Sequence, residues 1–258
     1  MKILTPKLYS VDRYVLATTV HCPKGTGPFP AVILLPGFLG HKDEMHIVTL
    51  AESLASEGMV ALRFDTAGSG GSEGTIEEDY LMSNYMNDID SMITYLAHQQ
   101  FVKKEVFGLW GYQMGGVAAL CFAAEYPSRI GAVATVSVPD SMAGVIWKKE
   151  VLSRWEKEKS YSFQVGKTSV SVPFSFIKDA RCYDASDSSK ALKCPFLSIV
   201  GTEDAEVPLQ LSLQVYENAP QPKNILEIPG KVEPSLYTDE QLKALNQKVC
   251  GFFSTSLP

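Results

Sequence analysis

The stretch "GYQMGG", residues 111–116, has the form of a turn that presents a catalytic side chain, but its central residue is glutamine. Gly111 and Gly115 flank Gln113 at the spacing of Gly-x-Ser-x-Gly, in which a nucleophilic serine occupies a sharp strand-to-helix turn. Glycine at these two positions leaves room for the bend. A carboxamide is a poor nucleophile, although it can donate and accept hydrogen bonds. We therefore expect the turn to form and Gln113 to act as a hydrogen-bonding group.

A serine nucleophile of this kind works with a histidine base, and no histidine follows His98 in the chain. The other histidines are His21, His41 and His46. We expect His46 and His98 to be surface or helix-capping residues. Without the serine and without a suitably placed imidazole, the sequence disfavours hydrolysis through an acyl-enzyme intermediate.

The composition indicates one α/β domain spanning residues 1–258, with 45% hydrophobic and 20% charged residues. The net charge of −6 offers no basic surface to phosphate backbones, so we expect no nucleic-acid partner. The five cysteines are scattered, and we predict neither a metal nor an organic cofactor. Apolar runs stay far below the roughly 18 residues of a membrane span. We expect no membrane partner, a cytoplasmic location, and a monomer or homodimer.

Short apolar runs alternate with segments of helical period, which is typical of a mostly parallel sheet covered by helices. The predicted strands are residues 31–36, 59–65, 105–110, 132–138, 196–201 and 224–229. The predicted helices are residues 43–57, 83–98, 115–125, 209–218 and 239–253. The turn at Gln113 therefore lies between a strand and a helix, where such a turn has to be.

One segment, residues 139–192, is far longer than the usual connection between a strand and the next strand of a parallel sheet. It begins with the charged amphipathic stretch "VIWKKEVLSRWEKEK" and continues with the alternating stretches "YSFQVG" and "TSVSVPFSFI" on either side of Gly166. This pattern predicts a helix followed by a β-hairpin. We interpret the segment as a lid over a pocket; the alternative is a structural excursion whose aromatic residues pack it down.

Four ordered motifs together resemble the α/β-hydrolase superfamily, and in particular lid-bearing esterases similar to cinnamoyl and feruloyl esterases. Besides the turn at Gln113, "LLPGFLGHKDE" resembles the oxyanion loop and "LRFDTAGSGGSEG" resembles a glycine-rich turn in which Asp65 is structural. "GTEDAEVP" resembles the acid-bearing loop. The resemblance runs from about Val15 to Phe252 and implies an α/β-hydrolase fold with a helix-plus-hairpin lid.

The resemblance also implies the roles of particular residues. The backbone amides of Met114 and Phe38 would bind an oxyanion, with Leu39 as the near alternative to Phe38. Asp204 matches the acid of the triad, with Glu203 and Glu206 as less favoured candidates, and Glu233 stands in the place of the histidine. The expected substrate-binding residues are Leu39, His41, Tyr112 and Trp147.

These residues suggest a site with Gln113, Glu233 and Asp204 as its catalytic groups. Two neighbouring carboxylates cannot both remain ionised cheaply, so Glu233 and Asp204 would supply a general acid or base, unless Lys231 neutralises them or Glu233 points to solvent. We therefore expect a non-hydrolytic enzyme, a cyclase, isomerase or lyase of specialised metabolism, acting on a small carbonyl compound. The alternatives are a catalytically silent ligand-binding pseudoenzyme and an atypical esterase that uses Glu233 and water.

Overall fold

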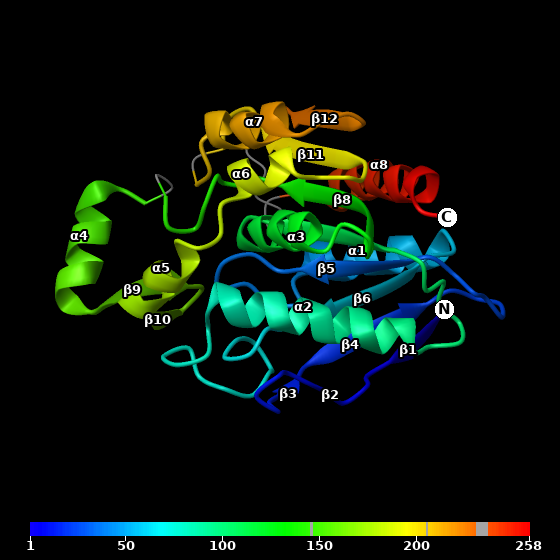
Figure 1. The fold of residues 1–258 in the computed structure, drawn as a ribbon, viewed down its shortest axis with the longest axis horizontal. Coiled ribbons are helices and arrows are strands. Elements are labelled where there is room, and N and C mark those ends of the chain that lie inside the picture. Colours follow the sequence, from blue (N-terminus) through cyan, green and yellow to red (C-terminus); the bar gives the residue numbers. More distant parts are fainter. Residues whose placement is uncertain (145–146, 205, 231–236) are drawn as a thin grey trace.

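A single mixed sheet forms the centre of the molecule (Figure 1). The computed structural model describes residues 1–144, 147–204, 206–230 and 237–258. Across these residues, eight strands lie side by side in the order β1 (Lys2–Leu4), β4 (Thr18–Cys22), β6 (Val60–Phe64), β5 (Ala31–Leu35), β7 (Phe107–Tyr112), β8 (Ile130–Val136), β11 (Phe196–Gly201) and β12 (Lys223–Ile228). The strands from β6 to β12 are parallel, and β1 and β4 are antiparallel to their neighbours. A separate short ribbon joins β2 (Leu8–Tyr9) to β3 (Val15–Leu16).

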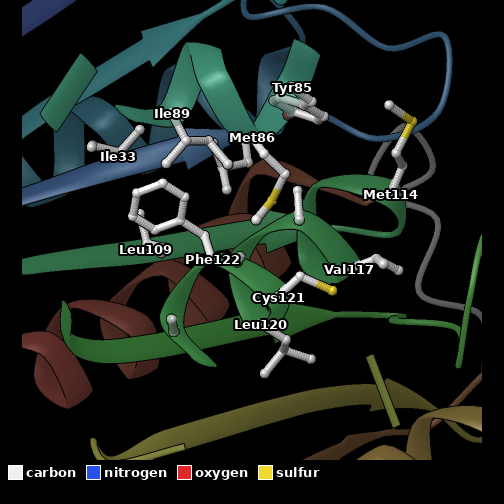
Figure 2. Close-up of a cluster of buried hydrophobic side chains, with 14 of the residues drawn as sticks. Ile33, Tyr85, Met86, Ile89, Leu109, Met114, Val117, Leu120, Cys121 and Phe122 are labelled. Carbon is white, nitrogen blue, oxygen red and sulfur yellow. The ribbon is translucent and has the colours of Figure 1, made fainter. Parts of the chain in front are cut away.

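Helices cover both faces of this sheet (Figure 1). One face carries α1 (Met45–Ser56) and α8 (Asp239–Ser256), and the other carries α2 (Met82–Ala97), α3 (Met114–Glu125), α6 (Ala185–Lys190) and α7 (Leu209–Asn218). Successive residues of a strand point to opposite faces, so Ile33 enters the core beneath α2 and α3, whereas Leu34 packs beneath α1. Figure 2 shows the first of these cores, where Phe122 of α3 lies near Leu109 of β7. Burial on both faces explains the continuous apolar runs in the sequence.

The predicted strands and helices are confirmed, with shifts of a few residues at their ends. The shift that matters for the site is at the end of β7. This strand continues two residues beyond the predicted end at Trp110, because its pairing with β8 extends to Tyr112 opposite Val136. The short strands β1, β2 and β3 near the N-terminus were not predicted. They contain only two or three residues each, too few to show an alternating pattern. The five-residue strand β4 was not predicted either, because its sequence TTVHC contains no apolar run.

The segment between β8 and β11 contains α4 (Lys149–Glu158), the hairpin of β9 (Ser160–Val165) and β10 (Thr168–Pro173), and α5 (Phe174–Ala180). The helix and the hairpin match the prediction. The prediction that "PFSFI" continues the second strand is wrong, because these residues begin α5. Pro173 explains the change: it has no N–H group to extend the ladder with β9, and its fixed φ suits a helix start.

This segment is joined to the body of the molecule at two places. At its base, Ser141 bridges Asp184, and the amide of Ala185 donates to the carbonyl of Asp140 at 2.7 Å. The following helix, α6, packs on α3 and α7, so the last part of residues 139–192 belongs to the layer that covers the sheet. The part that rises away from the sheet lies between Ser141 and Asp184, as the left side of Figure 1 shows.

An aromatic stack forms the second attachment. The ring of Trp155 in α4 lies parallel to Phe176 of α5 at 6.3 Å, and Phe176 in turn stacks on Tyr80 at 5.7 Å. The indole Nε1 of Trp155 donates to the carbonyl of Val172 at 2.8 Å, so this buried ring has no unsatisfied polar atom. The stack links the helix, the hairpin and the body of the molecule into one packed unit.

Candidate active site

Gln113 sits on the predicted strand-to-helix turn between β7 and α3. Its backbone has φ of 45° and ψ of −110°, a conformation that is rare for any residue with a side chain. A methyl group at Gly111 would overlap the carbonyl of Gly115, and one at Gly115 would overlap the carbonyl of Leu35. The two glycines are therefore required by the close approach of the backbone, and the turn forms with glutamine in place of serine.

The loop after β5 and the start of α3 carry the two backbone amides that were predicted to bind an oxyanion. Among the described residues, neither the Phe38 amide nor the Met114 amide donates a hydrogen bond. Met114 is the first residue of α3, where the N–H groups have no partner within the helix. The amide of Leu39 is different, because it donates to the hydroxyl of Tyr80 at 2.7 Å. The Leu39 amide is therefore occupied, whereas the amides of Phe38 and Met114, called the donor pair below, donate no bond within the described residues.

Tyr80 holds the two halves of this donor pair together. Its hydroxyl accepts from the Leu39 amide and donates to the sulfur of Met114 at 3.5 Å. The ring is fully buried, and burial raises the pKa of its hydroxyl far above the ordinary value of a tyrosine. Tyr80 therefore remains a neutral hydrogen-bonding group that fixes the loop after β5 against the start of α3.

A cavity of about 370 Å³ opens beside Gln113. Its apolar wall consists of Phe38, Leu39, Met142, Trp147, Phe163 and Val165. The polar lining comes from Gln113, Gln164 and Glu206. The predicted binding residues Leu39 and Trp147 thus line the cavity, and the segment that was interpreted as a lid supplies much of its wall.

The structure brings Glu206, and not Asp204, to the side chain of Gln113. The Gln113 Nε2 group donates to Glu206 Oε2 at 2.7 Å. Asp204 is occupied elsewhere: Oδ2 accepts from the hydroxyl of Ser137 at 2.6 Å, and Oδ1 accepts from the amides of Glu206 and Val207 at 2.9 and 3.0 Å. The sequence contained an indication of this role for Asp204, because the side chain of an aspartate in a turn often accepts a hydrogen bond from the amide two residues later in the chain.

The remaining predicted site residues lie apart from the cavity or outside the described residues. Glu233 and Lys231 belong to the second group, so their positions stay predictions. His41 is exposed, and its Nδ1 accepts from the amide of Asp43 at 3.2 Å. The ring of Tyr112 packs edge-on against His46 at 5.4 Å on the other face of the sheet. Neither His41 nor Tyr112 borders the cavity beside Gln113.

The expectation that His46 is a surface or capping residue is wrong. Its ring lies among Trp110, Tyr112 and the carboxylate of Glu44, whose Oε2 is 3.6 Å from Nε2. Burial lowers the pKa of His46 to about 4, so the imidazole is neutral near pH 7 and does not form an ion pair with Glu44 there. His98 does end a helix as expected, and its Nδ1 lies 2.7 Å from the carbonyl of Thr94.

Asp65 has the structural role expected for it. Its two carboxylate oxygens accept from the amides of Lys42 and Gly71, at 2.6 and 2.9 Å. These bonds tie the loop after β5 to the glycine-rich turn after β6. Asp65 therefore supports the loop that carries Phe38 without lining the cavity itself.

Residues 30–157 match the model of a family described as alpha/beta hydrolase fold. The chain has the α/β-hydrolase fold. The matched range contains the loop at Phe38 and the turn at Gln113, so it includes the donor pair described above. Among the described residues of this α/β-hydrolase fold, no helix is both long and apolar enough to cross a bilayer.

Solved structures support the same fold over nearly the whole chain. Est1E from Butyrivibrio proteoclasticus with ferulic acid bound gives a TM-score of 0.81 at 22% identity, over 98% of this chain and 99% of that one. The α/β hydrolase GrgF from Penicillium sp. sh18 gives a TM-score of 0.82 at 16% identity, over 99% of both chains. At these identities the likeness concerns the α/β-hydrolase fold alone.

Some of the relatives found by sequence are named as hydrolases. Human mitochondrial palmitoyl-protein thioesterase ABHD10 is 29% identical over 198 residues, which are 73% of this chain and 61% of the human protein. Thiohydrolase aneE of Aspergillus aculeatus is 29% identical over 154 residues, which are 55% of this chain and 47% of that protein. This chain thus spans about three fifths of the length of its human relative.

Proposed function

We propose that this chain is a cofactor-free, non-hydrolytic enzyme on an α/β-hydrolase scaffold, of the cyclase, isomerase or lyase type. Its substrate is a small carbonyl compound. The observation that carries the proposal is the position of Gln113 at the top of a fully formed turn, beside the Phe38 and Met114 amides that donate no bond within the described residues.

Such a pair of amides stabilises negative charge that develops on a carbonyl oxygen. In enzymes whose triad was removed, binding and the oxyanion site alone retained a rate factor on the order of 10³ to 10⁴ over water. Formation of an enolate, ring closure and elimination beside a carbonyl all place charge on that oxygen and need no covalent nucleophile. Gln113 fits these reactions because its carboxamide donates and accepts hydrogen bonds.

The protruding part of residues 139–192 is the lid of this site in our proposal. Trp147, Phe163 and Val165 from this segment line the cavity together with Phe38 from the body of the molecule. An apolar cover of this kind would exclude water and strengthen the electrostatic effect of the two amides. Glu233, which lies outside the described residues, stays in the proposal as a second carboxylate.

A second candidate function is hydrolysis by a water molecule that a carboxylate activates. The names of the relatives, thioesterase and thiohydrolase, favour this alternative. It avoids the need for a nucleophile at residue 113, since water attacks the carbonyl directly. Either Glu233 or Glu206 would then activate the water.

The test uses two probes, the activated ester p-nitrophenyl butyrate and the ketone benzylacetone. We expect the native protein to give no burst of p-nitrophenol and no butyryl adduct in its intact mass. We expect it to accelerate exchange of the protons beside the carbonyl of benzylacetone in heavy water, followed by proton NMR.

Restoring the missing groups is the positive control for the ester assay. Gln113→Ser combined with Glu233→His should gain ester turnover with a transient butyryl adduct, because the turn and the donor pair are already present. Steady ester turnover by the native protein without an adduct would support the second candidate. An adduct on the native protein, or the absence of ketone exchange, would contradict the proposed function.

A further inference from the structure

We propose that Glu206 is the proton-transfer residue of this site and that Gln113 and Asp204 are positioning residues that hold it there. The substrate class that follows is a neutral ketone or ester with a C–H bond beside its carbonyl and an apolar or aromatic substituent. This inference rests on the proposed function, because it supplies the base that enolate chemistry requires.

The first argument is the way in which the loop after β11 is fixed. Asp204 uses both carboxylate oxygens on local partners, one on the hydroxyl of Ser137 and one on the amides of Glu206 and Val207. Ser137 follows β8 and adopts φ of 48°, so the bond joins the ends of two neighbouring parallel strands. The aspartate that resembles a triad acid therefore orients the backbone at Glu206, and both of its oxygens are engaged.

The second argument is the contact between Glu206 and the turn. Gln113 Nε2 donates to Glu206 Oε2 at 2.7 Å, and no side chain or amide among the described residues donates to the other carboxylate oxygen of Glu206. The oxygen of the Gln113 carboxamide lies on the side of Gly37, the residue that precedes Phe38. Gln113 thus lies between the carboxylate and the donor pair: its side chain touches Glu206, and the next residue carries the Met114 amide.

The third argument is the lining of the cavity. Glu206 is the charged residue of that lining within the described parts of the chain, and Phe38, Trp147 and Phe163 provide aromatic wall. A substrate with a carboxylate of its own would be repelled by Glu206. A neutral carbonyl compound with an apolar substituent matches the aromatic wall at one end and the amides and carboxylate at the other.

The chemical step is balanced within these groups. Glu206 removes the proton as the C–H bond breaks, and the bonding electron pair forms a carbon–carbon double bond while the carbonyl π electrons move to oxygen. The oxyanion accepts hydrogen bonds from the Phe38 and Met114 amides. Glu206 then returns the proton to the same carbon, which regenerates the substrate. In a substrate whose enolate is conjugated with a further double bond, return of the proton to the far carbon of that system gives an isomer.

The experiment measures exchange of the protons beside the carbonyl of benzylacetone in heavy water, by proton NMR, for the native protein and matched variants. A positioned general base contributes a factor of about 10² to 10⁴, so Glu206→Gln should lower the exchange rate by about a hundredfold or more. Its affinity for benzylacetone should change little, because the aromatic wall is intact. Glu203→Gln removes the same charge from an exposed residue of the same loop and should exchange at the native rate.

Two readouts separate catalysis from structural support. The native rate should fall in acid as the carboxylate base is protonated, whereas the residual rate of Glu206→Gln should lack this limb. For the positioning role, Asp204→Ala should lower the rate by about tenfold to a hundredfold through misplacement of Glu206, and Asp204→Asn should recover part of the loss.

The outcomes distinguish this inference from the function on which it rests. Exchange by the native protein that survives in Glu206→Gln, with its acid limb unchanged, overturns the inference and leaves the proposed function standing. Exchange that Glu203→Gln lowers as strongly as Glu206→Gln also overturns it, since the effect would then be one of loop charge. No exchange by the native protein overturns the proposed function and the inference together.

Discussion

At the scale of single residues, the backbone of Gln113 is the most unusual feature of the site. A residue with a side chain in such a sparsely populated conformation costs on the order of 1–3 kcal/mol. The surrounding contacts impose it, because Gln113 donates from its amide to the Val136 carbonyl while its own carbonyl accepts from Gly116 and Val117. The molecule keeps a strained residue where a relaxed turn would be more stable.

This strain predicts that, at residue 113, a glycine variant is more stable than an alanine variant, the reverse of the usual order. Gln113→Ala and Gln113→Gly both remove the carboxamide and its bond to Glu206, so their difference isolates the backbone. Glycine usually costs stability relative to alanine, but at positive φ it should be more stable here, by about 1–2 kcal/mol. Denaturant unfolding of the two variants measures the difference. An alanine variant as stable as the glycine variant would contradict the strained geometry.

The sequence predicted this turn but not the partner of its central side chain. The spacing of Gly111 and Gly115 is local information, and a close backbone approach leaves few alternatives to glycine. The contact between Gln113 and Glu206 joins residues 93 positions apart and depends on where β7 and β11 end on either side of β8. Resemblance pointed to Asp204 because its position in the loop matches a triad acid, whereas hydrogen bonding assigns it to the loop itself.

At the scale of elements, the loop from Phe38 to Glu44 is held by a buried polar network. Arg63 of β6 donates from Nε to His21 Nε2 at 3.0 Å and from a guanidinium nitrogen to the carbonyl of Lys42 at 3.0 Å. It also pairs with Asp43. Burial and the neighbouring Arg63 lower the pKa of His21 to about 4, so this imidazole is neutral and accepts the bond. These bonds fix the loop that carries half of the donor pair.

His46, at the start of α1, predicts how stability depends on pH. Its pKa is about 4 in the folded protein and near 6.5 when unfolded, so the unfolded state binds more protons between these values. The stabilisation from the neutral buried ring is complete above about pH 6.5 and is lost as the pH falls toward 4. Relative to His46→Leu, the native protein should lose about 2–3 kcal/mol of unfolding free energy between pH 7 and pH 4.5.

Comparing the native protein with His46→Leu removes the contributions of the other buried titratable groups to the pH dependence of stability. His21 acts in the same direction as His46, whereas burial raises the pKa of Asp88 to about 6, which destabilises the fold as the pH rises toward that value. Both are present in the native protein and in the variant. His98→Leu removes an exposed imidazole and is the matched control for the loss of a histidine. A pH-independent effect of His46→Leu would show that its ring is not buried in the neutral form.

The elements themselves were predictable wherever their pattern was strong. Strands buried on both faces read as continuous apolar runs, and α2 shows a clear apolar face, so the body of the fold followed from the sequence. The segment after β8 was harder. Its alternation continues through "PFSFI", and only the missing N–H group of Pro173 indicates that the ladder stops and a helix begins.

At the scale of the whole molecule, the stack of Trp155, Phe176 and Tyr80 connects the protruding segment to the body. The segment shares no strand with the central sheet, since β9 and β10 pair only with each other in the described structure. Apolar packing therefore replaces backbone hydrogen bonds as the main attachment. Tyr80 contributes to this packing with its ring and to the donor pair with its hydroxyl, so the cover and the site share a residue.

Truncating the centre of this stack should affect the stability of the entire protein. Trp155→Ala removes a fully buried ring and should cost about 3–5 kcal/mol of unfolding free energy. Trp147→Ala, at a half-buried position beside the cavity, should cost less than half as much. Chemical unfolding followed by circular dichroism measures both. A native unfolding midpoint in Trp155→Ala, together with new proteolytic cleavage at Gly166, would show that the segment unfolds separately.

The placement of the tryptophans has an optical consequence. The chain contains three tryptophans, and two of them, Trp147 and Trp155, belong to the protruding segment. Trp147 borders the cavity and packs edge-on against Trp155 at 5.6 Å, close enough for excitation energy to pass between the two indoles. The intrinsic fluorescence of the protein is therefore weighted toward the protruding segment beside the cavity, and binding of a compound in the cavity should change this fluorescence without a label.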